Sequence, residues 1–290
     1  MTVASPAHAL PRTARSPHIV DVLIAERAPK LSASPAWPLV RPLLYAMLDY
    51  GRARRMADAI DPLPGRAALE HVSALLSVQV TARGLEHVPA KGRLIVVCNH
   101  PTGIADGIAV YDVLKALRPD LCFYANSDAH RVAHRLGEVL IPVEWVEAKR
   151  TRERTRQTLL ATRDALEAER CLIIFPSGRL ARRQADGRLC DPPWAPSAVS
   201  LARKYEAPIL PVHVAGPWST LFHFFNRFSG ELRDITLFHE LLNKQGRRFS
   251  LTIGAPIRPD ALVGEPADAI RSVKAYVERQ LPADPARAFA

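Results

Sequence analysis

The sequence lacks several features that would assign a protein to a class at once. It contains no stretch of about 18 uninterrupted apolar residues, so we expect no transmembrane helix. The first residues include Pro, Arg and His but no hydrophobic run typical of a signal peptide. Cysteine is scarce, and no pair has the CxxC spacing of metal and redox sites; the four are Cys98, Cys122, Cys171 and Cys190. These absences favour a cytoplasmic protein with reduced, mostly buried thiols.

Acidic residues are also in short supply relative to basic ones. The chain has 39 Lys and Arg against 29 Asp and Glu, a formal net charge of +10 at pH 7. Such a balance favours anionic partners, namely nucleic acid, anionic lipid or an acidic substrate. A hydrophobic content of 48% is ordinary for a folded protein, and 290 residues can bury a large core. We therefore expect one α/β domain with an N-terminal extension.

Composition and hydrophobic pattern divide the chain into segments. Ala, Pro, Ser and Arg dominate the start, which predicts a loosely ordered N-terminus with a short helix near Ile19 to Ala28. The apolar stretch from Trp37 to Leu48 is compatible with a helix in a membrane interface and equally with a helix packed on its own domain. The predicted segments are 1–35 (N-terminus), 36–78 (helical), 79–260 (main domain) and 261–290 (C-terminal helix).

Short β-branched runs alternate with helical patterns throughout the main domain. This alternation predicts a central, largely parallel or mixed sheet flanked by helices. The expected strands are 78–85, 94–98, 121–125, 139–143, 171–175, 208–214 and 249–254. We expect no internal repeat, and a helix over roughly 150–169 carries many charges.

Polar residues follow three of these strands, in the turns 99–106, 175–179 and 211–219. If the strands are parallel, all three turns open on the same edge of the sheet, where ligands bind in α/β proteins. His100 can then act as a general base, with Asp106 fixing its tautomer and stabilising its protonated form. The second turn offers backbone amides, and the arginines that follow it suit a phosphate or carboxylate; they are Arg179, Arg182 and Arg183.

The order of these motifs resembles a known family. An apolar strand followed by Asn-His-Pro and Asp, then Phe-Pro-x-Gly, then Ile-x-Pro-Val is similar to the lysophospholipid or glycerolipid acyltransferase superfamily. The similarity covers about 80–258, and bacterial 1-acylglycerol-3-phosphate acyltransferases typify the family. The resemblance implies transfer of a fatty acyl group from acyl-CoA or acyl carrier protein to the hydroxyl of a lyso-lipid. It implies no acyl-enzyme and no cofactor beyond the donor.

Site residues follow from this resemblance position by position. His100 matches the family's catalytic histidine, and Asp106 its carboxylate, although five residues separate them where the family has four. Two family arginines that contact glycerol phosphate correspond here to Val143 and Leu180, which puts that acceptor in doubt. Arg179, Lys149 or Arg150 can supply the charge instead. The substrate-binding positions that the resemblance implies are Asn99, Phe175, Pro176, Ser177, Gly178, Arg179 and Pro211.

The sequence also fits other interpretations. Ser177 follows a strand and is the candidate nucleophile of a serine esterase or thioesterase, although it lacks the Gly-x-Ser-x-Gly elbow. A non-catalytic lipid-binding protein of the same fold is a second alternative. The pair His130 and His134 has metal-ligand spacing without a third ligand, so we expect no metal, and no nucleic-acid module is recognised. The aromatic stretch 221–228 suits either lipid contact or a buried helix, and we expect peripheral contact with the inner membrane from its cytoplasmic face.

Overall fold

A seven-stranded sheet forms the centre of the computed structural model, which describes residues 17–144, 151–184 and 187–290. The strands lie in the order β1-β9-β8-β2-β5-β3-β4, and every neighbouring pair is parallel except β8 and β9. The prediction of a largely parallel α/β sheet is therefore confirmed. The strands are β1 (Gln79–Arg83), β2 (Leu94–Cys98), β3 (Leu121–Asn126), β4 (Leu140–Val143), β5 (Cys171–Ile174), β8 (Ile209–Ala215) and β9 (Arg248–Ile253).

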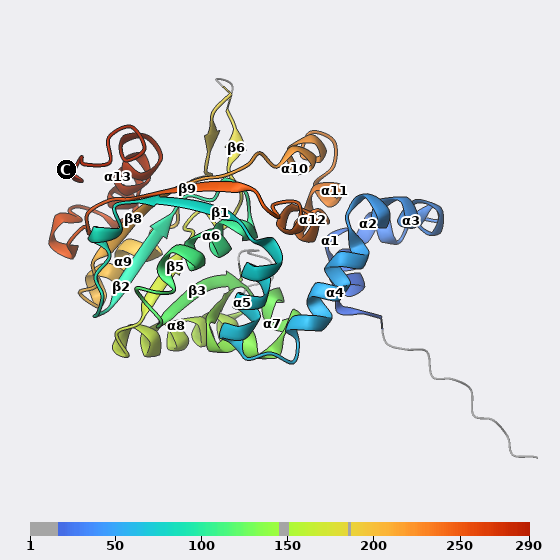
Figure 1. Cartoon of the computed structure of the whole chain (residues 1–290), viewed down its shortest axis with the longest axis horizontal. Coiled ribbons are helices and arrows are strands. Elements are labelled where there is room, and N and C mark those ends of the chain that lie inside the picture. Colours follow the sequence, from blue (N-terminus) through green and yellow to red (C-terminus); the bar gives the residue numbers. More distant parts are fainter. Residues whose placement is uncertain (1–16, 145–150, 185–186) are drawn as a thin grey trace, which may run out of the picture.

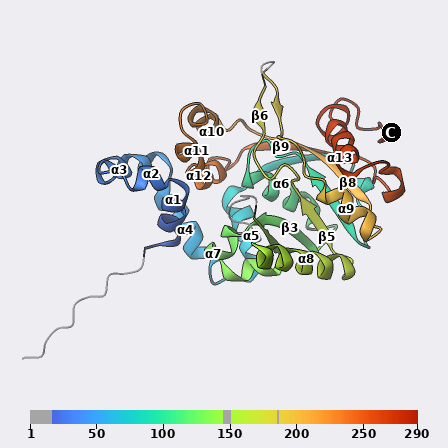
Figure 2. The same cartoon turned by 180° about the vertical axis from the view of Figure 1, so that it is seen from behind.

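Helices cover both faces of the sheet (Figures 1 and 2). All five residues of β2 are buried, since a central parallel strand packs on both sides and therefore has a continuous apolar sequence. Val96 and Cys98 face one core layer, whereas Ile95 and Val97 face the other. The first layer is shared with α5 (Gly65–Leu76), α6 (Ile104–Leu114) and α7 (Asp128–Val132), and the second with α8 (Arg152–Glu167), α9 (Ser197–Lys204) and α13 (Pro266–Ala275).

The N-terminal helices extend from one side of the sheet (Figure 1). Residues 1–16 of the segment expected to be loosely ordered lie outside the described residues. The short helix expected near Ile19 to Ala28 is confirmed as α1 (Ile19–Arg27), and it is better ordered than the expected loose N-terminus because it buries Val20 and Leu23 in the core. The helices are α1 (Ile19–Arg27), α2 (Pro29–Ser32), α3 (Trp37–Met47) and α4 (Tyr50–Ile60). Among the described residues, none of the helices combines the length and apolar content needed to cross a bilayer.

Several short elements surround the carboxyl edge of the sheet. A small hairpin follows β5, and three short helices follow β8; of these, the sequence indicated only the first helix. They are β6 (Arg182–Arg183) and β7 (Leu189–Cys190), then α10 (Thr220–Phe225), α11 (Gly230–Asp234) and α12 (Leu237–Leu242). Helix α13 continues into a π-helical turn over Tyr276–Gln280, and 3₁₀ turns lie at Leu85–His87, His134–Glu138 and Pro259–Ala261.

Candidate active site

His100 and Asp106 meet at the carboxyl end of β2. The Nδ1 atom of His100 lies 2.9 Å from the Oδ2 atom of Asp106. The carboxylate is fully buried, whereas the imidazole side chain keeps 16% of its surface exposed. A protonated Nδ1 that donates to Asp106 leaves the lone pair on Nε2. The pair thus has the arrangement of a general base oriented by a carboxylate.

Five residues separate His100 from Asp106, one more than in the family, and the backbone of this loop curves around the Asp106 carboxylate. Asp106 accepts from the backbone N–H of Thr102 at 2.9 Å, from its hydroxyl at 2.5 Å, and from the N–H of Gly103 at 3.0 Å. Gly103 has φ of 102°, a conformation that favours glycine, and it directly precedes the first turn of α6. A carboxylate in the first turn also interacts favourably with the helix dipole.

A second buried carboxylate supports the backbone of His100. The Asp191 side chain accepts the His100 N–H at 3.1 Å and the indole N–H of Trp194 at 2.9 Å. Burial raises the pKa of Asp191 from 3.8 to about 6. The ring of Phe175, from the end of β5, packs on the imidazole with ring centres 4.5 Å apart. His100 is therefore held on its backbone, on its ring face and at Nδ1.

Asn99 and Pro211, predicted as substrate-binding residues, form hydrogen bonds between strands of the sheet. The Asn99 side chain donates to the Val214 carbonyl at 2.9 Å and accepts from the Val214 N–H at 2.7 Å, which ties β2 to β8 just before His100. Pro211 is buried inside β8, and its carbonyl accepts from Gly254 at 2.9 Å. Neither residue lines the cavity beside His100, so the structure brings them near the site without exposing them to it.

The turn after β5 places its backbone next to His100. Gly178 has φ of 58°, and its N–H donates to the Phe175 carbonyl at 2.9 Å, which commits this amide to the turn that begins before Pro176. Among the described residues, the N–H groups of Ser177 and Arg179 have no protein acceptor. The Ser177 hydroxyl donates to the Arg179 carbonyl at 2.8 Å and to no histidine of the described part. Nothing there activates Ser177 as a nucleophile.

An apolar cavity of about 350 Å³ extends from this pair. His100, Phe175, Gly178 and Arg179 border it, and an ion pair between Arg27 and Asp128 at 2.7 Å also contributes to its wall. Most of the wall is aliphatic or aromatic, which suits an extended hydrocarbon chain. Helices α1, α4, α5, α6, α7 and α12 and strand β3 supply these side chains, among them Leu23, Met56, Val72, Ile108, Phe123, Val132 and Phe238.

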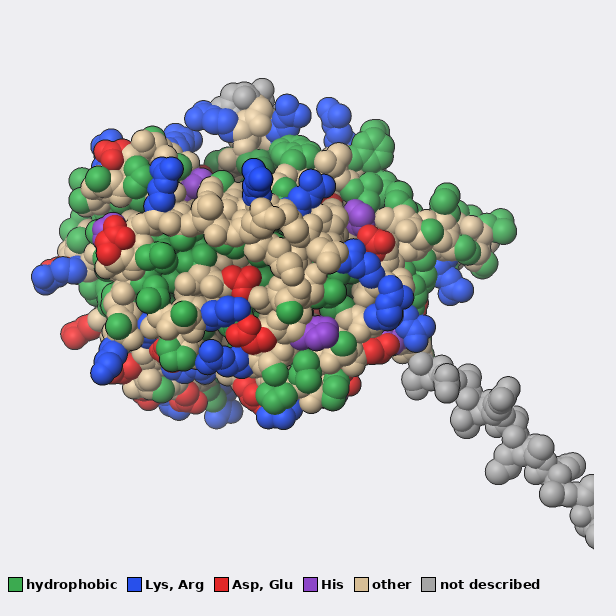
Figure 3. Space-filling view, viewed as in Figure 1, with side chains coloured by type: hydrophobic (Ala, Val, Ile, Leu, Met, Phe, Trp, Pro, Cys, Tyr) green, Lys and Arg blue, Asp and Glu red, His purple; other side chains and the backbone are tan. Residues whose placement is uncertain are grey.

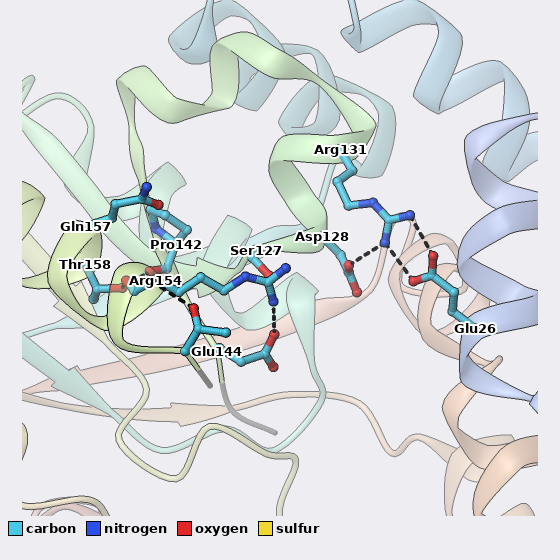
Figure 4. A pocket seen from close by; sticks show the side chains of 10 residues that line it. Glu26, Ser127, Asp128, Arg131, Pro142, Glu144, Arg154, Gln157 and Thr158 are labelled. Atoms are coloured by element: carbon cyan, nitrogen blue, oxygen red, sulfur yellow. Dashed lines mark hydrogen bonds and ion pairs between the residues drawn. The ribbon is translucent and has the colours of Figure 1, made fainter. Parts of the chain in front are cut away.

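A separate polar pocket of about 650 Å³ lies beyond the ends of β3 and β4 (Figure 4). Its arginines are already engaged by acids. Arg131 bonds Glu26 through both terminal nitrogens, at 2.7 and 2.8 Å, and Arg154 bonds Glu144 at 3.2 Å. Lys149 and Arg150, proposed as substitutes for a family arginine, lie outside the described residues. Val143 is the last residue of β4, at the end of the strand expected over 139–143.

Two residues that contact the His–Asp pair were not assigned from sequence. Thr102 belongs to the motif that identified the site, and its position between His100 and Asp106 could have suggested a local hydrogen bond. Asp191 is 91 positions from His100 and follows no recognisable motif, so only the tertiary structure reveals it. His134, considered as a metal ligand, bonds Asp61 at 3.2 Å, and the described residues contain no group of three potential metal-binding side chains.

Comparisons with known proteins found a matching family model, two similar curated proteins and a similar solved structure. A protein-family model described as Acyltransferase matches residues 79–215. The lyso-glycine lipid O-acyltransferase of Phocaeicola vulgatus is 27% identical over 65% of this chain and 68% of its own length. Its counterpart of the same name in Bacteroides thetaiotaomicron is 24% identical over 65% of this chain and 70% of its own. The crystal structure of the 1-acyl-sn-glycerophosphate acyltransferase of Thermotoga maritima matches 93% of this chain and 98% of that one, with 16% identity and a TM-score of 0.47.

Proposed function

The chain belongs to the glycerolipid acyltransferase superfamily, and from this premise we propose that it transfers a fatty acyl group from a thioester to the hydroxyl of a lyso-lipid. One observation carries the proposal: an imidazole oriented by a buried carboxylate borders an apolar cavity. The cavity suits the acyl chain, and the imidazole suits deprotonation of a hydroxyl. The reaction class is O-acyl transfer.

His100 acts as the general base in this mechanism. Its Nε2 accepts the proton of the acceptor hydroxyl while that oxygen attacks the thioester carbonyl carbon. Asp106 stabilises the imidazolium that forms. When the tetrahedral intermediate collapses, the thiolate leaves and takes the proton from the imidazolium, which returns His100 to its neutral form. The N–H groups of Ser177 and Arg179 are the candidates to bind the oxyanion. The acceptor oxygen is the nucleophile, so no acyl-enzyme forms.

The acceptor we propose carries a head group other than glycerol phosphate. The apolar side chains of Val143 and Leu180 support this view, since they stand at the two positions where the family pattern that the sequence resembles has arginines for the acceptor phosphate. The two curated relatives are named for a lyso-glycine lipid, which makes that lipid the first acceptor to assay. The donor is acyl-CoA or acyl carrier protein, both anionic molecules that the net charge of +10 favours.

We propose that the enzyme works at the cytoplasmic face of the inner membrane as a peripheral protein. Leu39 and Leu43 on α3 are 84% and 73% exposed, and Phe224 and Phe228 on and after α10 are 53% and 72% exposed. Hydrophobic side chains gather over α3 and near α10 on the same side of the molecule (Figure 3). Exposed apolar side chains of this size are typical of helices that insert into a lipid interface.

The proposal is tested with the purified full-length protein, lyso-glycine lipid and either acyl-CoA or acyl carrier protein as the donor. We expect His100→Ala to lose at least about a thousandfold in turnover without loss of folding, because the base is removed. Ser177→Ala is the matched control and keeps its activity.

The alternatives predict other outcomes in this assay. Thioester hydrolysis that needs Ser177 and survives His100→Ala identifies an esterase. Lipid binding without thioester consumption identifies a lipid-binding protein.

A further inference from the structure

A cluster of arginine and aromatic side chains lies next to the His–Asp pair and has no part in the mechanism above. The guanidinium carbon of Arg182 lies 5.0 Å from the centre of the Phe222 ring, and that of Arg183 lies 5.7 Å from the centre of the Trp218 ring. Trp218 stacks on His223 with ring centres 4.1 Å apart. Strand β6 and helix α10, with the loop before it, thus interleave cations and rings. We call these five residues the arginine–aromatic cluster.

Two nitrogen atoms of the cluster are buried without a hydrogen-bond partner among the described residues. They are Nη1 of Arg182 and Nε2 of His223, which come from different elements. Buried polar atoms nearly always have a hydrogen-bond partner, and the guanidinium of Arg182, which can only donate, costs the most free energy without an acceptor. The faces of the neighbouring rings attract a cation but do not replace an acceptor oxygen. The site therefore requires an acceptor that the described protein does not provide.

The charges around Arg182 indicate the sign of that acceptor. Burial lowers the pKa of Arg182, and the nearby Arg233 and Arg179 lower it further. Asp234 is the acid that opposes them, and it already pairs with Arg233 at 2.6 Å. Burial also lowers the pKa of His223, and Arg182 adds to this effect. Positive charge therefore exceeds negative charge here, which favours an anion.

The backbone connects the cluster directly to the catalytic loop. The N–H of Ala181, the residue before Arg182, donates to the His100 carbonyl at 2.9 Å. Leu180 and Arg179 border the same cavity as His100. Arg182 therefore directly follows a residue that is bonded to the His100 backbone, and Ser219, which directly precedes α10, donates to the Thr102 carbonyl at 3.3 Å.

We propose that the arginine–aromatic cluster binds the anionic head group of the acceptor lipid, a carboxylate or a phosphate, with Arg182 and His223 as the donors. The inference rests on the proposed function. In this proposal, residues of the β6–β7 hairpin and α10 bind the head group in place of the family arginines, whose positions are occupied here by Val143 and Leu180. A planar guanidinium suits the two oxygens of a carboxylate, and the neighbouring imidazole adds a second donor.

The test compares lyso-glycine lipid with its methyl ester, which keeps the shape of the head group and removes its charge. We expect Arg182→Gln to raise the KM for the free acid by about tenfold or more, the effect of losing one hydrogen bond between charged groups. Its KM for the methyl ester and for the donor stays within about twofold of the parent, as does kcat. Arg182→Lys recovers part of the loss, since it restores charge without the planar fork.

Arg258→Gln is the matched control, because Arg258 is exposed and far from the cluster. It follows Ile257, which pairs with Ile209 at the start of β8, the edge of the sheet opposite to His100. The control variant leaves every KM unchanged. An equal rise in KM for acid and ester overturns the proposal, as does a rise confined to the donor, which assigns the cluster to the donor's phosphates. His223→Gln provides the same comparison if Arg182→Gln does not fold. A parent protein that acylates neither lipid, nor any lyso-lipid, contradicts the proposed function instead.

Discussion

Thr102 illustrates how a single side chain sets the geometry of the His–Asp pair. It is fully buried, and both its hydroxyl and its N–H donate to Asp106. These two hydrogen bonds hold the Asp106 carboxylate in its orientation independently of its contact with His100. We expect Thr102→Val to lower kcat by about tenfold to a hundredfold, since one carboxylate oxygen loses its donor and the carboxylate can rotate. KM for the acceptor changes little.

Steady-state kinetics with both substrates checks this expectation. Thr102→Ser keeps the hydroxyl and is the control, with kcat within about threefold of the parent. A Thr102→Val enzyme with the turnover of the parent contradicts a role for Thr102 in positioning Asp106.

Asp191 makes folding stability depend on pH. Its pKa is raised by burial from 3.8 to about 6, so between these values the folded protein holds a proton that the unfolded chain has released. The free energy of unfolding then falls as pH rises through that window, by roughly 3 kcal/mol in total. The side chain of Asp191→Asn cannot ionise, so the free energy of unfolding of this variant lacks that dependence on pH.

Urea unfolding at pH 4, 5, 6 and 7 measures the effect. The parent loses about 2 kcal/mol more than Asp191→Asn between pH 4 and pH 7, because at pH 4 the carboxyl of the unfolded chain is already partly ionised. Asp268→Asn, on the exposed surface of α13, serves as the control and follows the parent. Parallel curves for the parent and Asp191→Asn contradict the raised pKa.

At the scale of elements, helix α12 connects to the loop that carries His100 and Thr102 through a buried ion pair. Lys244, just after α12, bonds Glu240 at 2.9 Å and the Ser219 hydroxyl at 3.1 Å. Ser219 in turn donates to the Thr102 carbonyl at 3.3 Å. Lys244 is only 1% exposed, so Lys244→Met leaves the Glu240 carboxylate buried without its cation. We expect this variant to lose about 3–5 kcal/mol of stability.

The double variant Glu240→Gln/Lys244→Met recovers a large part of that loss, because it removes the uncompensated charge. Lys91→Met, at an exposed position, is the control and stays within about 0.5 kcal/mol of the parent. Equal stability of Lys244→Met and the parent in urea unfolding shows that the pair is not buried in solution.

The elements that sequence predicts well are those whose signal is local. Strand β2 occupies Leu94–Cys98 as expected, since five consecutive buried apolar residues leave little ambiguity. The hairpin β6–β7 and helices α11 and α12 escaped prediction because they are short and depend on contacts far along the chain. The same holds within the site. His100 and Asp106 lie in one motif, whereas Asp191 and Lys244 reach the loop only through the fold.

At the scale of the whole molecule, basic charge and exposed apolar groups occur together. Helix α3 carries Leu39 and Leu43 beside Arg41, and Arg227 lies between Phe224 and Phe228. Figure 1 places α3 and α10 toward the same end of the molecule, the end that also carries the N-terminal helices bordering the cavity. A lyso-lipid and an acyl product both reside in a bilayer, so an enzyme that docks by this end meets its acceptor without extracting it into water.

Vesicle flotation tests whether this end binds lipid, with vesicles that contain a third of phosphatidylglycerol. We expect Leu39→Ser/Leu43→Ser and Phe224→Ser/Phe228→Ser each to weaken binding by about tenfold or more, because each removes two apolar side chains worth roughly 1.5–3 kcal/mol apiece when buried. Binding by the parent weakens with salt, as expected for arginines near anionic lipid. Leu159→Ser, at a 58% exposed position on α8, is the matched control and floats like the parent. Equal flotation of all three folded variants contradicts the docking surface, and a loss as large in Leu159→Ser shows that any exposed leucine suffices.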